Sequence, residues 1–187
     1  MKRSRSVKLL TMASATLALT ACQEEIDTEG ELYRSVLECK NADLVPNEDC
    51  EPLLEEGRRI HASTAPRYNS ASLCVQEHGT GECKYQSGGD PSYYSPSPYG
   101  YLVVGALAGG AVGDLVRPIY RTKDRRGYYS TGGGYVNYLG NGRYGTNQKS
   151  IRQYNSKVTR AAPKIQTRTT VASRGGFGSR GGFSFGS

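Results

Sequence analysis

The chain has 187 residues, with 24 Lys and Arg against 17 Asp and Glu, and a formal net charge of +7. Its two apolar stretches, residues 9–19 and 102–112, are shorter than the roughly 20 residues that a helix needs to cross a bilayer, which argues against a protein held in the membrane by a helix. Charge is unevenly spread, because residues 22–100 hold six basic and fifteen acidic side chains, whereas residues 117–187 hold fourteen basic ones and the single acid Asp124. This asymmetry predicts a basic C-terminal part that seeks anionic partners.

Residues 1–21 have the pattern of a bacterial lipoprotein signal peptide. Four basic residues precede a short apolar segment, and Leu19-Thr20-Ala21-Cys22 resembles a lipobox. Two or three acyl chains on such a cysteine hold a protein firmly at the bilayer. We therefore predict an exported lipoprotein that contacts the lipid bilayer through acylated Cys22; an ordinary secretory signal with a chance cysteine is the alternative. Gln23 follows the cysteine instead of Asp, which by analogy favours the outer membrane, facing the periplasm.

The next two segments differ in composition. Residues 22–31 are acidic and poor in apolar groups, which predicts a solvated tether. Residues 32–86 look globular, and we predict a small α+β domain for them. Ser35 and Ser70 are each followed four residues later by a cysteine and are expected to cap helices, Ser35 with Glu38 in a capping box.

A longer helix is predicted in the middle of this domain. Pro52 suits its first turn, and apolar residues recur at spacings of three to four until Pro66 stops it. Leu53, Leu54 and Ile60 are expected on the core face of this helix.

Four cysteines remain besides Cys22, namely Cys39, Cys50, Cys74 and Cys83. An even number in an exported protein predicts disulfides, which a domain of this size needs for stability. Four cysteines allow three connectivities, and the internal repeat favours Cys39 with Cys50 and Cys74 with Cys83. Zinc binding or thiol redox chemistry would need CxxC spacing, which the chain lacks.

No set of residues forms a catalytic pattern. The two histidines, His61 and His78, have no serine or carboxylate placed nearby for nucleophilic or general-base chemistry. We predict that the protein is not an enzyme and needs no metal or cofactor.

Beyond Ser87 the chain becomes rich in Gly and Tyr. Residues 87–101 are predicted to form a Tyr/Pro/Ser linker, whose tyrosines could stack on glycans or bases or lie in solvent. In residues 102–116, Gly105, Gly109 and Gly113 recur at every fourth position, the small-residue stripe that lets helices approach closely. This stripe predicts membrane-surface insertion or homo-oligomerisation, with a flexible segment as the alternative.

Residues 117–187 are predicted to be a disordered tail, because only ten of the 71 residues are Leu, Ile, Val or Phe. The tail ends in two Arg-Gly-Gly-Phe elements, which contain Arg174 with Phe177 and Arg180 with Phe183. Such elements bind phosphates through Arg and stack through Phe. In an exported protein we expect them to bind lipopolysaccharide, anionic phospholipid or peptidoglycan, and we do not expect nucleic acid as the partner. A purely solubilising tail is the alternative.

These residues carry a resemblance to a known family. The lipobox, Thr64-Ala65-Pro66-Arg67-Tyr68, Cys74, Gly81-Glu82-Cys83 and the late Arg174-Gly-Gly-Phe-Gly178 are similar to the YgiB-like proteins, a bacterial family of unknown function. The resemblance implies no substrate and no catalytic residue.

The sequence as a whole predicts a small α+β, disulfide-stapled N-terminal domain followed by low-complexity, mostly disordered chain. The predicted function is that of a non-enzymatic envelope binding or scaffold protein whose basic tail contacts anionic envelope polymers. The alternative is a self-associating, membrane-active protein that uses the Gly105, Gly109 and Gly113 stripe.

Overall fold

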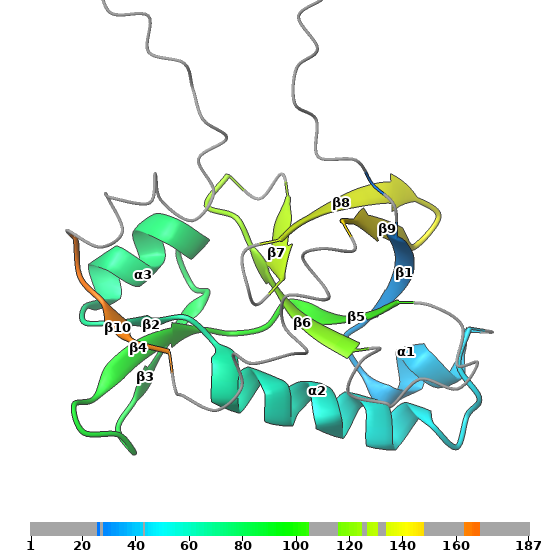
Figure 1. The fold of residues 1–187 in the computed structure, drawn as a ribbon, viewed down its shortest axis with the longest axis horizontal. Coiled ribbons are helices and arrows are strands. Elements are labelled where there is room, and N and C mark those ends of the chain that lie inside the picture. Colours follow the sequence, from blue (N-terminus) through cyan, green and yellow to red (C-terminus); the bar gives the residue numbers. More distant parts are fainter. Residues whose placement is uncertain are drawn as a thin grey trace, which may run out of the picture.

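The structure is a computed structural model and describes residues 26, 28–42, 44–104, 116–124, 127–130, 134–147 and 163–168. The described residues form two sheets and three helices. The helices are α1 (Val36–Lys40), α2 (Cys50–Thr64) and α3 (Ala71–His78). In Figure 1, α2 runs along one side of the molecule, with a sheet of short strands beside α3 at one end and the longer strands of a barrel at the other.

Six strands form a closed antiparallel barrel in the order β1-β5-β6-β7-β8-β9. They are β1 (Thr28–Tyr33), β5 (Gly100–Val104), β6 (Val116–Arg121), β7 (Tyr128–Ser130), β8 (Tyr135–Gly140) and β9 (Arg143–Thr146). The first strand closes the barrel, because Gly30 lies opposite Val104 of β5 and opposite Tyr144 of β9.

Strand β5 shows how the barrel divides its side chains between two cores. Successive side chains of a strand point to opposite faces. Leu102 and Val104 belong to a cluster that also holds Ile119, Val136 and Tyr144 from three other barrel strands. Tyr101 and Val103 belong to the second cluster, which packs against the helices. The barrel is therefore filled by its own side chains and also supports the helical layer.

The predicted central helix is confirmed as α2. Leu53 and Leu54 are fully buried and Ile60 nearly so, all in the cluster shared with β5 and β6. The helix ends at Thr64, before the Ala65-Pro66 pair. Both predicted caps are also present, since the hydroxyl oxygens of Ser35 and Ser70 accept hydrogen bonds from the first turns of α1 and α3.

A second sheet lies beside α3 in the order β10-β2-β4-β3. Its strands are β2 (Arg67–Tyr68), β3 (Cys83–Gln86), β4 (Tyr93–Pro96) and β10 (Ile165–Gln166). Tyr68 of β2 packs with Leu73 and Cys74 of α3 in a small core of its own.

The hairpin between β8 and β9 turns through three residues in the left-handed region. Gly140, Asn141 and Gly142 have φ angles of 98°, 52° and 77°. Glycine adopts such angles without steric cost, and asparagine tolerates them better than most residues. This tight turn brings Tyr138 of β8 opposite Tyr144 of β9.

The predicted fold class is wrong. Five of the six barrel strands lie between residues 100 and 146, in chain that was expected to be linker, apolar segment or disordered tail, and β1 begins within the expected tether. The described part is mostly β and is not a small α+β domain with a disordered remainder. The prediction counted Leu, Ile, Val and Phe as core formers, but the barrel also buries tyrosines. Tyr120, Tyr129 and Tyr144 are each at most 9% exposed.

Candidate functional site

A pocket of about 510 Å³ opens at one end of the barrel and is lined by tyrosines. We call it the tyrosine pocket. Five tyrosines and an arginine shape it, namely Tyr33, Arg34, Tyr99, Tyr128, Tyr138 and Tyr144. They come from β1 and the segment after it, from the residue before β5, and from β7, β8 and β9. The pocket therefore exists only because the barrel closes.

The rings form a continuous aromatic surface. Tyr99 stacks on Tyr128 with ring centroids 4.8 Å apart and an angle of 23° between the rings. Tyr128 meets Tyr144 edge to face at 5.7 Å, and Tyr144 lies 5.1 Å from Tyr138 in a tilted arrangement. Tyr138 is 59% exposed, whereas Tyr144 is 9% exposed. The surface thus runs from a solvent-exposed ring into the barrel.

Charged groups lie at the edge of this surface. The guanidinium carbon of Arg121 lies 4.1 Å from the centroid of Tyr99, and that of Arg34 lies 5.8 Å from it. Arg34 also pairs with Glu38 at 3.0 Å, and its backbone N–H donates to the same carboxylate at 2.6 Å. The Tyr33 hydroxyl donates to Glu31 at 2.9 Å. Two carboxylates and two guanidinium groups therefore surround the rings.

The neighbouring charges separate the pKa values of the two stacked tyrosines. Burial raises the pKa of Tyr128, and its hydrogen bond to Tyr99 raises it further. Burial also acts to raise the pKa of Tyr99, but the hydrogen bond from Tyr128 and the charges of Arg121 and Arg34 outweigh it, so the pKa of Tyr99 is lowered. Tyr99 therefore carries the more acidic hydroxyl of the pair.

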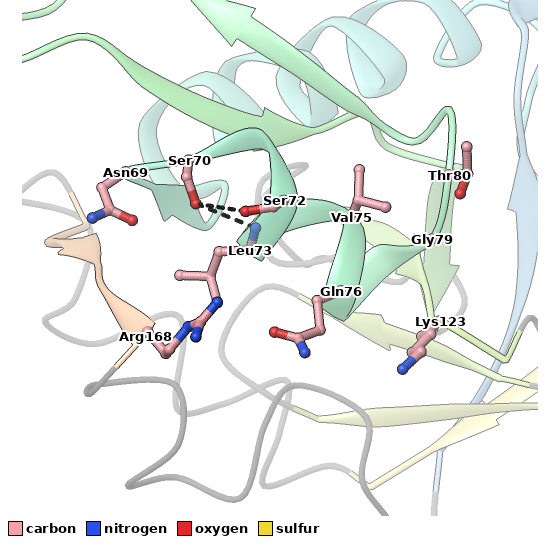
Figure 2. A pocket seen from close by; sticks show the side chains of 10 residues that line it. All are labelled: Asn69, Ser70, Ser72, Leu73, Val75, Gln76, Gly79, Thr80, Lys123 and Arg168. Carbon is pink, nitrogen blue, oxygen red and sulfur yellow. Dashed lines mark hydrogen bonds between the residues drawn. The ribbon is translucent and has the colours of Figure 1, made fainter.

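A second pocket, of about 800 Å³, lies along α3 (Figure 2). We call it the α3 pocket. Its polar lining comes from α3 and its flanks and from two cations, namely Asn69, Ser70, Ser72, Gln76, Thr80, Lys123 and Arg168. Ser70 accepts a hydrogen bond from the backbone N–H of Leu73 at 3.3 Å, so it is engaged in capping the helix.

Two histidines join the helices to the barrel. His78 is 1% exposed; its Nδ1 donates to the backbone carbonyl of Arg121 at 3.2 Å, which leaves Nε2 to accept from the Tyr68 hydroxyl at 2.8 Å. His61 forms a hydrogen bond of 2.9 Å between its Nδ1 and the Tyr120 hydroxyl. These contacts give both histidines a structural role at the junction of α2, α3 and β6.

The stability of the protein is expected to fall on acidification because of His78. Burial lowers the pKa of His78 from 6.5 to about 4, and the hydrogen bond to Arg121 only partly opposes this shift. Between these two values the unfolded chain binds the proton and the folded chain does not, so stability is intact above pH 6.5 and falls as the pH approaches 4. We expect a loss of roughly 2 kcal/mol in the free energy of unfolding by about pH 5.

Urea unfolding at a series of pH values measures this loss. The His78→Gln variant is expected to have a flatter pH profile whatever its stability at neutral pH. The His61→Gln variant serves as the comparison, and its free energy of unfolding should still fall with decreasing pH nearly as steeply as that of the wild type. A His78→Gln profile as steep as that of the wild type would contradict this assignment.

The structure pairs Cys39 with Cys50 and Cys74 with Cys83, which is the connectivity that the sequence favours. The first disulfide joins the C-terminal end of α1 to the start of α2, and the second joins α3 to β3. Cys39, Cys50 and Cys74 are completely buried. The disulfides therefore fasten each short helix to the element that follows it.

Several predicted site residues lie outside the described residues, namely Cys22, Gly105, Gly109, Gly113, Arg174, Phe177, Arg180 and Phe183. Their roles stay predictions. Within the described ranges, no helix combines the length and apolar character that a bilayer crossing requires. The same residues contain no group of three or more His, Cys, Asp and Glu side chains placed to hold a metal ion.

The tyrosine pocket is not predicted from the sequence. The signal available was the concentration of tyrosine, since eleven of the 14 tyrosines lie beyond Ser87. Tyr99 belongs to the predicted linker whose tyrosines could stack on a ligand, but its partner Tyr128 lies 29 residues further on. Their proximity depends on the pairing of β5 with β6 and of β6 with β7, which local patterns do not reveal.

The family described as "Protein of unknown function (DUF1190)" matches residues 27–185. The chain is also 30% identical, over 177 residues, to a UPF0441 protein of Erwinia tasmaniensis, with 88% of this chain and 76% of the relative covered. No solved structure matches it. The predicted membership of an uncharacterised family is confirmed, and the chain belongs to the DUF1190 family.

Proposed function

We propose that this protein is a non-enzymatic binding protein of the bacterial envelope, anchored through acylated Cys22, and that its tyrosine pocket binds glycan chains. The observation that carries the proposal is the row of Tyr99, Tyr128, Tyr144 and Tyr138 in one pocket. The mouth of a β-barrel is a common place for a ligand, and oligosaccharides are among the ligands that small barrels bind.

Tyrosine suits a sugar ring for a physical reason. A sugar ring has an apolar face of C–H groups and a rim of hydroxyls, and tyrosine matches it with an apolar ring and one polar tip. The stack of Tyr99 on Tyr128 leaves fewer ring faces free, whereas Tyr138, at 59% exposure, presents a ring to an incoming ligand. Tyr138 is therefore the expected stacking platform.

The charges of the pocket favour a neutral polyhydroxyl ligand over an ion. Glu31 and Glu38 carry two negative charges, and Arg34 and Arg121 carry two positive ones. Carboxylates accept hydrogen bonds from hydroxyls and guanidinium groups donate to them, and hydrogen bonds with a charged partner are the stronger kind. The rim can thus bind hydroxyls without attracting ions of either sign.

The predicted location narrows the choice of glycan. A lipoprotein that faces the periplasm meets the glycan strands of peptidoglycan, one of the three partners expected from the sequence. The predicted contacts of Arg174 and Arg180 with anionic polymers would add a second, charge-dependent attachment. Binding at the tyrosine pocket should depend little on salt, which separates the two contributions.

The Tyr138→Ala variant tests this proposal. We expect it to bind soluble peptidoglycan oligosaccharides about fivefold to tenfold more weakly than the wild type, because it loses one stacking platform. The matched control is Tyr85→Ala, since Tyr85 on β3 is 58% exposed, has its own aromatic neighbour and lies outside the pocket. Titration calorimetry at low and high salt gives the affinities. Equal affinities for the two variants, or no saturable binding by the wild type, would refute the glycan site.

A further inference from the structure

The α3 pocket differs from the tyrosine pocket in its charge. Two cations, Lys123 and Arg168, line it, and among its described lining residues none is acidic. The nearby Asp124 accepts a hydrogen bond from the Thr122 hydroxyl, so that carboxylate is already engaged. Two cations in a described lining without carboxylates favour anions over cations at this place.

The two cations come from different parts of the chain and flank one helix face. Lys123 follows β6, and Arg168 follows β10. In Figure 2 they lie on either side of Gln76, whose amide points into the same space. Serine and threonine hydroxyls at Ser72 and Thr80 complete a lining of hydrogen-bond donors. This arrangement suits a ligand that is long enough to reach both cations.

We propose that the α3 pocket binds an extended ligand with two phosphate groups, one at Lys123 and the other at Arg168. Phosphate fits this lining better than a neutral group does, because it offers several acceptor oxygens to cationic and hydroxyl donors. A volume of about 800 Å³ accommodates a ligand of the size of a bisphosphorylated sugar or a phospholipid headgroup. This site is separate from the tyrosine pocket and does not depend on glycan binding there.

Titration calorimetry with full-length, detergent-solubilised protein tests the proposal. The probes are orthophosphate, glucose 1,6-bisphosphate and deacylated cardiolipin, which is a headgroup with two phosphates. We expect one of the two bisphosphates to bind saturably and at least about tenfold more tightly than orthophosphate. If glucose 1,6-bisphosphate binds more tightly, the ligand is a phosphorylated sugar; if deacylated cardiolipin does, it is a phospholipid headgroup.

The Lys123→Gln and Arg168→Gln variants are each expected to weaken binding of the better bisphosphate about tenfold. Lys84→Gln and Arg58→Gln are the charge-matched controls, since both side chains are exposed and lie outside the pocket. The controls should bind like the wild type. Equal losses of affinity in variants and controls would show a general charge effect and would overturn the site. The absence of saturable binding by the wild type would also overturn it. Equal affinities for orthophosphate and the bisphosphates would overturn the two-phosphate geometry.

Discussion

The Gly30→Ala variant is expected to lose roughly 3 kcal/mol in the free energy of unfolding, at the upper end of the usual range for overpacked sites. Gly30 is buried in β1, between β5 and β9. A Cβ atom at this position would overlap the backbone carbonyl oxygen of Val103 and come within 2.9 Å of its carbonyl carbon. These are backbone atoms of the neighbouring strand, so no side-chain rotation relieves the overlap.

The expected loss corresponds to a melting temperature lower by about 6 to 12 °C for a chain of this size. Thermal and urea unfolding followed by circular dichroism measure it. The control is Glu29→Ala, one residue away in the same strand. The Glu29 side chain is 52% exposed and pairs with Arg143 on the surface, a contact worth at most about 1 kcal/mol. If both variants were equally stable, the close approach of β1 and β5 at Gly30 would be refuted.

Replacing Cys39 and Cys50 together by alanine is expected to have a similarly large effect. Closing a loop of this length stabilises a protein by roughly 3 kcal/mol, because the disulfide restricts the unfolded chain. Both cysteines are completely buried in the cluster that joins the helices to the barrel, so their removal also leaves a cavity. The disulfide between Cys74 and Cys83 closes a loop of nearly equal length but packs in the smaller cluster around Tyr68. The Cys74→Ala, Cys83→Ala variant removes it. We therefore expect this variant to lose less free energy of unfolding than the Cys39→Ala, Cys50→Ala variant.

Urea unfolding of both double variants without reductant measures the free energy of unfolding that each one loses. Adding reductant to the wild type should reproduce only the part of these losses that comes from breaking the disulfides, because the reduced thiols still fill the space that alanine leaves empty. Reductant should leave a variant that lacks all four cysteines unchanged. Finding four free thiols in protein purified from the periplasm would refute both disulfides. If the Cys74→Ala, Cys83→Ala variant lost more free energy of unfolding than the other, the expectation that the disulfide in the larger cluster contributes more would be refuted.

The features that the sequence predicts well are those that depend on neighbouring residues. The caps at Ser35 and Ser70 each need a hydroxyl and an amide three residues away. Helix α2 needs a periodicity of three to four residues and a proline after its end. The two disulfides close loops with sequence separations of only 11 and 9. Each of these features is fixed within a short window of the chain.

The barrel and the tyrosine pocket depend on contacts that no short window contains. Glu29 of β1 forms its ion pair with Arg143 of β9, 114 residues further on. The strands between them are short and rich in Tyr and Gly, a composition that is also typical of disordered chain. Tyr120 and Tyr144 are buried as core residues although each carries a polar hydroxyl. The pairing that gathers the tyrosines is therefore a property of the fold.

The position of β1 in the barrel has a consequence for the kinetics of folding. Thr28 pairs with Thr146, so the first strand cannot complete its pairing until almost the whole barrel sequence is available. Contacts between such distant residues form slowly, because a long loop has to close before they can stabilise the chain. The short loops around α1 and α3 close at a lower entropic cost, so we expect them to form first and the barrel to close last. A chain that stops before β9 would leave β1 with an open edge that can pair with other chains and aggregate.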